Sequence, residues 1–401
     1  MKKQDIIIIG AGIVGLSTAM KLLEKSPDLS VTILEKEADI AVHQTGHNSG
    51  VMHSGIYYTP GSLRAKNCQT GYKQLVDFCD ENDVEYDICG KIIVAVDEEE
   101  VSRLEDVFDR GQANGLNGIR MIASEEVEEI EPNIQAKKGI WVPQTGIVHF
   151  PDVAKKILER FRKMGGELIL NAKVTNILVQ ADEVIVETTK GAFHTEQMIN
   201  CAGLYADKVA EMTGNQAGLS IIPFRGEYYR LLPEKEYLVK NLVYPTPNPA
   251  FPFLGVHFTR MIKGGIEAGP NAVFAFAREG YSNKDVNLKE LFGALKFSGF
   301  RKLGRKHWRF GLDEMKRSYS KRHFYNALRR MMPELEMEDV EYYRAGVRAM
   351  ALGKDGEVVD DFVITTNKRV LNVWNAPSPA ATACFSIGDH ISGMALEPAY
   401  S

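Results

Sequence analysis

Apolar and small residues alternate along the first forty positions in the order that a strand, a helix and a second strand require. Asp5–Ile9 ends in four consecutive isoleucines, a β-branched run typical of a parallel strand buried on both faces. Apolar residues with helical spacing follow over 16–25, and Val31–Leu34 is again a short apolar run. The pattern therefore predicts a βαβ unit at the start of the chain.

Similar patterns return later. The stretches 92–149 and 221–333 are richer in aromatic residues, prolines and alternating apolar positions, which favours an antiparallel sheet. The chain is therefore expected to cross several times between two domains. The remaining predicted elements are an amphipathic helix over 152–164, a strand and turn over 167–177, a short buried strand at 198–203 and a helix over 379–396.

Three glycines stand in the turn between the first strand and the helix. Gly10 permits the tight turn, Gly12 lets the backbone approach a pyrophosphate, and Gly15 lets the helix pack on the strand. The first helical turn offers unpaired N–H groups and a positive dipole end to phosphates. Glu35 ends the second strand, 20 residues after Gly15, where its carboxylate can accept hydrogen bonds from ribose hydroxyls. This arrangement predicts a dinucleotide site.

Composition narrows the class of protein. The 401 residues are 44% hydrophobic and 25% charged, which is typical of a globular protein of two or three domains. No apolar run is long enough to cross a bilayer, and we expect no signal or transit peptide before the first strand. Five scattered cysteines, never spaced as CxxC, indicate reduced thiols and a cytoplasmic location. The net charge of −5 argues against nucleic-acid binding.

The segment after Glu35 favours a flavin over a nicotinamide dinucleotide. Instead of another βα unit, a polar, glycine-containing loop follows over 42–58, suited to wrapping a bulky ligand. This loop and several later strings resemble the L-2-hydroxyglutarate oxidase/dehydrogenase family, within the wider group of glycine oxidase and D-amino-acid oxidase. The strings are HNSGVMHSGIYYTPGSL at 47–63, PFRGEYYRL at 223–231, YPTPNPAFPFLGVHFTR at 244–260, GPNAVFAF at 269–276, AGVRAMAL at 345–352 and NAPSPAATACFSIG at 375–388.

The resemblance implies FAD as the cofactor and an α/β fold, with a Rossmann-like FAD-binding domain and a second, antiparallel-sheet substrate domain as in D-amino-acid oxidase. We place the FAD-binding domain at 1–90, 150–220 and 340–401, and the substrate domain at 91–149 and 221–339. The helix that starts near Pro379 is expected to direct its N-terminal dipole at the flavin. The resemblance also implies cofactor contacts at Lys36, Thr45, His47, Asn48, Ser49, Gly50, Val174, Ala202, Gly203, Ser378, Pro379, Ala380, Ala381 and Thr382.

Substrate contacts are expected from arginine and tyrosine side chains. Arg348 resembles the arginine that anchors substrate carboxylates in amino-acid oxidases of this group, with Ala349 in place of the usual proline. A guanidinium holds a carboxylate through two parallel hydrogen bonds. A dicarboxylate needs a second anchor, for which Arg225 and Arg260 are the candidates. Candidate hydroxyl contacts are Tyr57, Tyr58 and Tyr228.

Oxidation of an alcohol also needs a group that takes the hydroxyl proton, and a neutral imidazole can do so near pH 7. His53 corresponds to a histidine near the flavin in glycerol-3-phosphate oxidising flavoproteins, and His257 lies in the string GVHFT. We expect His53 to be the base, with His257 as the alternative. His43 and His47 are expected to contact cofactor or loop backbone.

Residues 296–330 form a strongly basic stretch. Twelve lysines and arginines stand against two acids, a net charge of +10 that leaves −15 for the rest of the chain. Seven aromatic residues are interleaved with them. Basic helices with aromatic residues suit an anionic membrane surface, which would fit an enzyme that delivers electrons to a membrane quinone. A solvated helical face or an oligomer contact explains the same pattern.

The sequence thus predicts an FAD-dependent 2-hydroxy acid oxidoreductase. Its expected reaction converts L-2-hydroxyglutarate to 2-oxoglutarate by hydride transfer to flavin N5, with electrons passing on to a membrane quinone or to dioxygen. We expect a cytoplasmic protein, bound peripherally to the inner membrane, and no metal site. One alternative is a flavin-dependent glycine or D-amino-acid oxidase, and the other is a non-catalytic flavin-binding protein.

Overall fold

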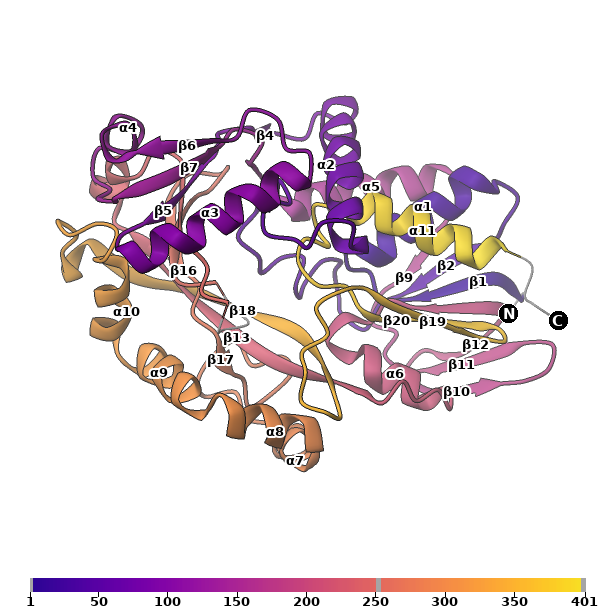
Figure 1. The fold of residues 1–401 in the computed structure, drawn as a ribbon. Coiled ribbons are helices and arrows are strands. Elements are labelled where there is room, and N and C mark those ends of the chain that lie inside the picture. The colour runs from indigo at the N-terminus through magenta and orange to yellow at the C-terminus, as the bar shows by residue number, and fades with distance from the viewer. Residues whose placement is uncertain (1–2, 250–253, 398–401) are drawn as a thin grey trace.

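Two large sheets lie side by side in the computed structural model, which describes residues 3–249 and 254–397 (Figure 1). Four residues of the string at 244–260, residues 250–253, lie outside the described residues. The first sheet carries the N-terminal βαβ unit, and the second carries most of the segments with alternating apolar positions. The predicted α/β fold with a second sheet domain is confirmed.

The first sheet has eight strands in the order β10-β11-β12-β1-β2-β9, with β20 paired to β12 and β19 paired to β20. Strands β1, β2, β9, β12 and β20 are parallel to one another, whereas β10, β11 and β19 pair antiparallel. The bounds are β1 Gln4–Ile9, β2 Val31–Leu34, β9 Glu167–Ile169, β10 Val174–Val179, β11 Val184–Thr188, β12 Gly191–Asn200, β19 Val363–Asn367 and β20 Val370–Asn375.

Helices cover one face of this sheet and bury its apolar side chains. Helix α1 packs between α5 and α11, and α11 in turn packs on α2. Ile8 of β1 and Leu16 of α1 are fully buried in the core that these helices share with the sheet. The bounds of the helices in this domain are α1 Ile13–Lys25, α2 Leu63–Glu81, α5 Phe150–Lys163, α6 Ala206–Met212 and α11 Cys384–Leu396, with the 3-10 turn η1 at Gly203–Tyr205.

The second sheet has nine strands in the order β17-β13-β16-β15-β14-β5-β7-β6, with β18 paired to β13. All of its pairs are antiparallel except β5 with β14. Figure 1 shows the long strands β13 and β18 reaching from this sheet towards the first domain. The bounds are β5 Lys91–Ala95, β6 Arg120–Ala123, β7 Lys138–Val142, β13 Leu219–Leu231, β14 Leu242–Pro245, β15 His257–Arg260, β16 Ile266–Gly269, β17 Val273–Phe274 and β18 Val340–Gly353.

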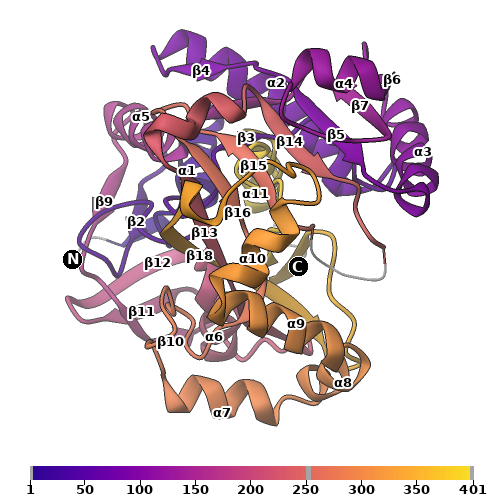
Figure 2. The same cartoon turned by 90° about the vertical axis from the view of Figure 1, so that its left-hand side faces the viewer.

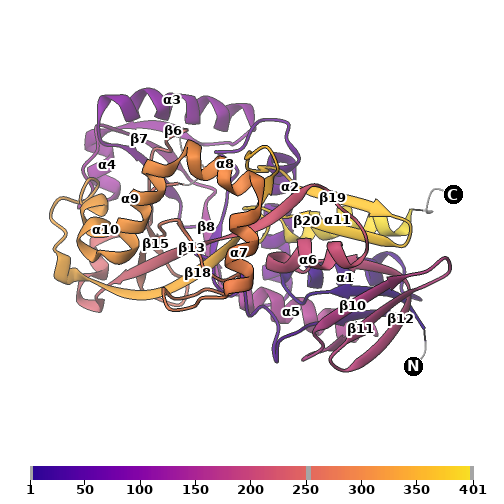
Figure 3. The same cartoon turned by 90° about the horizontal axis from the view of Figure 1, so that it is seen from below.

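The remaining elements surround the second sheet. Helices α9 and α10 cross one side of it (Figure 2), and α7, α8 and α9 are all in view from below (Figure 3). The small sheet β3-β8-β4 lies where the polar loop after β2 meets the first domain. The bounds are β3 Val51–Met52, β4 Tyr86–Asp87, β8 Gly146–Val148, α3 Glu98–Ala113, α4 Ser124–Ile130, α7 Leu288–Lys296, α8 Ser298–Lys306, α9 Trp308–Tyr319, α10 Lys321–Leu328, η2 Pro233–Leu238 and η3 Met337–Asp339.

Two expectations from the sequence need correction. The last helix begins at Cys384, not Pro379, because residues 377–383 form turns in which Ala380 N donates to Pro377 O and Ala383 N donates to Pro379 O. The domain boundary expected at 340 lies after Gly353, since β18 pairs with β13 of the second sheet along its whole length. Residues 340–353 thus belong to the second sheet, although they were predicted to lie in the FAD-binding domain.

Candidate functional site

A cavity of about 1460 Å³ runs between the two sheets. Most of the residues that the sequence analysis assigned to cofactor and substrate lie along its wall, although they come from segments hundreds of positions apart. The predicted residues that line it are Gly10, Gly12, Gly15, Glu35, Lys36, Thr45, His47, Asn48, Ser49, His53, Tyr57, Tyr58, Val174, Ala202, Gly203, Tyr228, His257, Arg348, Ser378, Pro379, Ala380, Ala381 and Thr382.

One end of the cavity is the glycine turn before α1. Gly10 has a φ of +103°, and a Cβ on Gly15 would lie 2.1 Å from the Gly10 carbonyl oxygen, so the turn needs glycine at both positions. A Cβ on Gly12 would meet only the Thr45 hydroxyl, at 3.6 Å. The N-cap residue Gly12 has no side chain that could cap α1, and Ile13 N donates to Thr45 Oγ1 of the polar loop at 3.1 Å. This end is therefore shaped for a phosphate group.

Glu35 is held beside the glycine turn by the backbone. Its carboxylate accepts hydrogen bonds from Ala11 N at 2.7 Å and from Glu37 N at 2.9 Å, and it is buried on the cavity wall. Each carboxylate oxygen retains a lone pair for a further donor. The position matches the one expected for an acid that binds ribose hydroxyls, so the residues at this end fit the adenosine half of a dinucleotide.

The polar loop after β2 is tied to the second sheet and to the turn before α11. Thr382 Oγ1 accepts from His53 N at 3.1 Å and donates to Val51 O at 3.3 Å. Arg344 of β18 donates to Asn48 O at 2.7 Å and to Glu267 at 2.6 Å. These contacts hold the loop open along the cavity, so the wall from Gly12 to Thr382 fits an extended dinucleotide such as FAD.

Two histidines and three tyrosines gather where the cavity meets the second sheet. His53 and His257 line the wall together with Tyr57, Tyr228 and Tyr244. The His257 ring packs on Tyr244 with 3.9 Å between ring centroids, and its Nδ1 donates to Gly255 O at 2.8 Å. Because a carbonyl oxygen only accepts, this bond leaves the lone pair of neutral His257 on Nε2.

Both imidazoles are neutral at physiological pH. Burial, together with the nearby Lys91, His257 and Arg64, lowers the pKa of His53 to about 3. Burial also lowers the pKa of His257 to about 3, with Arg348 and Lys91 as the nearby cations and the bond to Gly255 O opposing the shift. The cavity therefore offers two uncharged proton acceptors.

Arg348 lies on β18, and its guanidinium faces the same part of the cavity. It donates to Asn271 O at 3.2 Å and lowers the pKa of Tyr228, whose burial raises that pKa overall. The neighbouring Ala349 N donates to Gln44 Oε1 at 3.1 Å, a bond that a proline at this position could not make. Alanine here therefore ties β18 to the polar loop.

Three predicted site residues lie elsewhere. Arg225 is buried against Glu227, Asn283 and the Ser282 carbonyl oxygen. Arg260 pairs with Asp87, and Gly50 packs against Val148 O rather than on the cavity wall. The alternation of side chains along a strand explains why these two arginines point away from the cavity. Arg348 pairs with Phe224 in the β13–β18 ladder, so the next residue, Arg225, points to the other face of the sheet. Arg260 is three residues from His257 on β15 and therefore points to the face opposite His257. Neither arginine is placed to hold a second carboxylate.

Lys91, the first residue of β5, lies beside the cavity but is not among the residues predicted from the sequence. Its side chain is only 1% exposed, and its Nζ lies over the rings of Tyr57 and Tyr244 at 4.5 and 4.9 Å. Both rings line the cavity. The sequence shows only a lysine at the start of the apolar string KIIVA. A lysine at the exposed end of a strand would give the same pattern.

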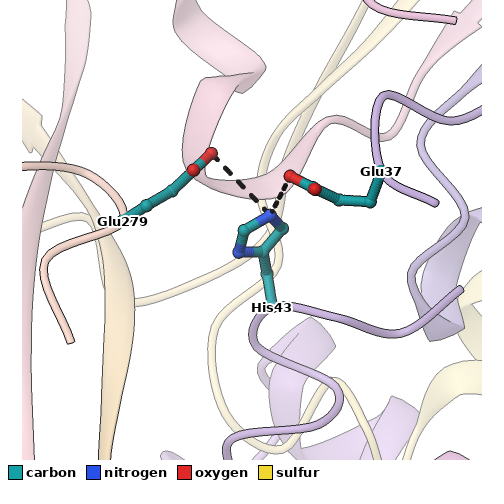
Figure 4. Close-up of side chains that lie close together, drawn as sticks. All are labelled: Glu37, His43 and Glu279. Carbon is teal, nitrogen blue, oxygen red and sulfur yellow. Dashed lines mark hydrogen bonds and ion pairs between the residues drawn. The ribbon is translucent and has the colours of Figure 1, made fainter. Parts of the chain in front are cut away.

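A second cluster joins the domains at the adenosine end. Figure 4 shows Glu37 and Glu279 approaching His43 from opposite sides, with one ligand atom of each residue within 4.8 Å of the others. Lys36 Nζ contacts Glu37 and lies 2.6 Å from Glu279 Oε1. Because the lysine already supplies the positive charge that these carboxylates need, we interpret the cluster as an ion-pair network between domains rather than a metal site.

The same segment carries a buried ion pair. Both Arg278 terminal nitrogens donate to Asp207 of α6, at 2.6 and 2.7 Å, and Asp207 also accepts from Ile221 N at 3.0 Å. The Asp207 side chain is completely buried. This pair joins the two sheets beside the cavity.

We expect Arg278→Met to lower the free energy of unfolding by about 3–5 kcal/mol, because it leaves the Asp207 charge buried without a partner. Denaturant unfolding of the cofactor-loaded protein measures the loss. The double variant Arg278→Met/Asp207→Asn removes that charge as well and should recover part of the loss. A single variant within 1 kcal/mol of the native protein would contradict the expected energetic role of the pair.

Comparison with known proteins finds similarity to flavin-dependent oxidoreductases. The family profile described as FAD dependent oxidoreductase matches residues 5–394. The chain is 50% identical to the L-2-hydroxyglutarate dehydrogenase of Indibacter alkaliphilus, over 98% of this chain and 99% of that protein. It is 45% identical to the protein of the same name from Escherichia coli K12, over 96% and 92%. Identity to the mitochondrial L-2-hydroxyglutarate dehydrogenase of Homo sapiens is 42%, over 97% and 88%.

Solved structures share the fold at lower identity. The L-alpha-glycerophosphate oxidase from Mycoplasma pneumoniae with FAD bound has a TM-score of 0.82 and 23% identity, covering 100% of this chain and 96% of that one. Glycine oxidase from Geobacillus kaustophilus has a TM-score of 0.74 and 14% identity, again covering 100% and 96%. The predicted D-amino-acid oxidase-like fold is therefore confirmed.

Proposed function

Because this chain belongs to the FAD-dependent oxidoreductases and, within them, to the family of L-2-hydroxyglutarate dehydrogenases, we propose that it oxidises L-2-hydroxyglutarate to 2-oxoglutarate. The predicted cofactor, FAD, is confirmed by that membership. The observation that carries the substrate proposal is one continuous cavity that joins a dinucleotide cradle to an arginine and two neutral imidazoles.

The chain's own residues divide the work along the cavity. The glycine turn and Glu35 would hold the adenosine diphosphate half of FAD, and residues 378–382 line the same cavity farther along the chain of contacts to the polar loop. When bound, FAD supplies the acceptor for the two electrons that leave the substrate. Arg348 binds one substrate carboxylate and thereby fixes the carbon that bears the hydroxyl group.

His53 is the proposed acceptor of the hydroxyl proton. Its ring belongs to the cavity wall, and the Thr382 hydroxyl fixes the backbone beside it. His257 lies close enough to Arg348 for the guanidinium to lower its pKa, so it stands near the carboxylate that Arg348 binds and is the alternative proton acceptor. The two negative charges of a bound dicarboxylate would raise the pKa of both histidines and so make proton uptake by His53 easier.

An anaerobic titration tests the function. We expect L-2-hydroxyglutarate to bleach the flavin absorbance of the purified holoenzyme within the mixing time, and 2-oxoglutarate to appear in equal amount. Glycine and D-amino acids should leave the absorbance unchanged, which also tests the amino-acid oxidase alternative. Bleaching by an amino acid and not by the hydroxy acid would overturn the substrate assignment. A flavin that no substrate in this set reduces would favour the non-catalytic alternative.

A second proposal concerns the surface of α7, α8 and α9. Leu288, Phe292 and Leu295 form an exposed stripe at i, i+4 and i+7 on α7. Helix α9 repeats the arrangement with Trp308, Leu312, Met315 and Tyr319. We call these seven residues the apolar face. Two exposed apolar stripes on helices that both contact α8 are unusual for a surface that meets only water.

Charge complementarity favours an anionic lipid surface as the partner of the apolar face. Six basic side chains of α8 and α9 are exposed around it, Arg301, Lys302, Arg305, Lys306, Arg309 and Lys316. Leu303 and Lys306 of α8 also line the cavity, so the face lies beside one end of it. Within 3–249 and 254–397, no helix is long and apolar enough to cross a bilayer. We propose peripheral binding that brings the cavity next to a membrane quinone.

Co-sedimentation with lipid vesicles checks this proposal. The holoenzyme should bind vesicles that contain phosphatidylglycerol and not vesicles of phosphatidylcholine alone, with weaker binding at high salt. Trp308→Gln/Leu312→Gln should reduce the binding at least tenfold, whereas Lys137→Gln on the far side of the second sheet should not change it. Equal binding of native and double-variant protein would show that the apolar face is not the membrane contact, and no binding at all would favour the solvated or oligomer interpretation.

A further inference from the structure

Lys91 is a buried cation that the proposed reaction does not use directly. Strand β5 places it between two neighbours, opposite Leu242 of β14 and Val142 of β7, so its side chain leaves the middle of a sheet and not an edge. It is 1% exposed. An ammonium at such a position loses most of its hydration, which is costly unless an anion or a ring face replaces the water.

The surroundings of Lys91 supply ring faces and cations but no anion. Tyr57 and Tyr244 cover its Nζ at 4.5 and 4.9 Å from their ring centroids. Among the described residues it makes no ion pair with a carboxylate, and the Cys68 thiol of α2 is the one group that favours its charged form. The titratable or charged groups that face this region are His53 and Tyr57 from the polar loop, Arg64 and Cys68 from α2, Tyr244 from β14 and His257 from β15. From β7 the facing residue is the apolar Val142.

The result is a lysine poised between two charge states. Burial lowers its pKa to about 7, with the Cys68 thiol opposing the shift only weakly. Near neutral pH the ammonium and the neutral amine of Lys91 are therefore close in free energy, behind the two tyrosine rings. An anion on the other side of those rings would favour the ammonium.

We propose that Lys91 is a positioning residue which takes up a proton from solvent when a dicarboxylate binds, and that the resulting ammonium acts as the electrostatic counter-charge for the second carboxylate. This inference rests on the proposed function, because it needs a dianionic ligand on the cavity side of Tyr57 and Tyr244. It also accounts for the missing second anchor, since neither Arg225 nor Arg260 reaches the cavity. The neutral amine lone pair binds the proton, and no covalent bond to the ligand forms.

Proton uptake is measurable without turnover. The probe is 2-oxoglutarate, which the oxidised holoenzyme cannot oxidise further, titrated calorimetrically at equal pH in phosphate and in Tris buffer. Because these buffers differ in ionisation enthalpy, the difference in heat gives the number of protons taken up. We expect nearly zero protons at pH 5.5, where the amine is already charged, and most of one proton at about pH 8. Affinity should accordingly fall about tenfold between pH 7 and 8.5.

Variants assign the proton. Lys91→Met should abolish the uptake and weaken binding about 10²-fold at pH 6.5, with little further change as the pH rises. Lys91→Arg keeps a permanent positive charge, so it should also abolish the uptake while binding stays tight up to pH 8.5. The matched control is Lys138→Met on the neighbouring strand β7, where the lysine is only partly buried and is paired with Glu105 at 2.9 Å. This control should behave as the native protein.

The outcomes separate this inference from the proposed function. Failure of the native holoenzyme to bind 2-oxoglutarate, by heat or by flavin spectrum, would overturn the proposed function and this inference together. Binding with buffer-independent heats at every pH would overturn this inference alone. Uptake that persists in both Lys91 variants would assign the proton to His53 or His257 and would equally overturn it.

Discussion

Replacement of Arg348 by methionine is expected to reduce kcat/KM for L-2-hydroxyglutarate by about 10²- to 10⁴-fold while the flavin content of the protein stays unchanged. The guanidinium is the one arginine of the three predicted anchors that lines the cavity beside both imidazoles. Its loss removes the bidentate hold on a carboxylate and leaves the carbon to be oxidised free to move. Steady-state kinetics and the flavin spectrum measure the two effects separately.

Two further variants sharpen the Arg348 experiment. Arg348→Lys keeps the positive charge but loses the planar guanidinium. Compared with Arg348→Met, we therefore expect a partial recovery of KM and a smaller recovery of kcat. Arg230→Met is the matched control, since Arg230 lies on the paired strand β13 in an exposed ion pair with Glu341 at 2.6 Å. A loss below tenfold in Arg348→Met, or an equal loss in the control, would show that another group anchors the carboxylate.

The N-terminal βαβ unit could be predicted closely because its signals are local. Isoleucine runs, the glycine spacing and the position of Glu35 each constrain the backbone within a few residues. The observed strands and helix agree with the predicted ones to within three residues at each end. Strand β18 was misplaced because its partner β13 starts more than a hundred positions earlier, and no local pattern reports such a pairing.

The candidate site could be predicted only in part, for the same reason. Arg348, His53 and His257 were predicted from their strings, and all three line the cavity. Arg225 and Arg260 were misassigned because a string does not show which face of a strand a residue takes, and period-two alternation turns both away from the cavity. Lys91 was missed because its burial depends on Tyr57 and Tyr244, which lie on other segments.

The histidines should separate in kinetics. We expect His53→Gln to lower kcat by about 10²- to 10⁴-fold with a small change in KM, because the variant loses the proton acceptor but keeps the carboxylate anchor. His257→Gln should mainly raise KM, because His257 lies near the carboxylate anchor. The Arg348 guanidinium is close enough to lower the pKa of His257. A larger kcat loss in His257→Gln than in His53→Gln would exchange the two roles.

The pH dependence provides an independent test of the same assignment. A base must be neutral to accept a proton, and burial lowers the pKa of His53 to about 3, so the free enzyme keeps this base neutral well below the usual range of histidine. Since kcat/KM reports groups of the free enzyme, its profile should show no fall between pH 7 and about pH 5, where a histidine of ordinary pKa would cause one near pH 6.5. A loss of kcat/KM centred at pH 6–7, which His53→Gln abolishes, would mean that His53 is hydrated in solution and that the cavity does not exclude water from the base.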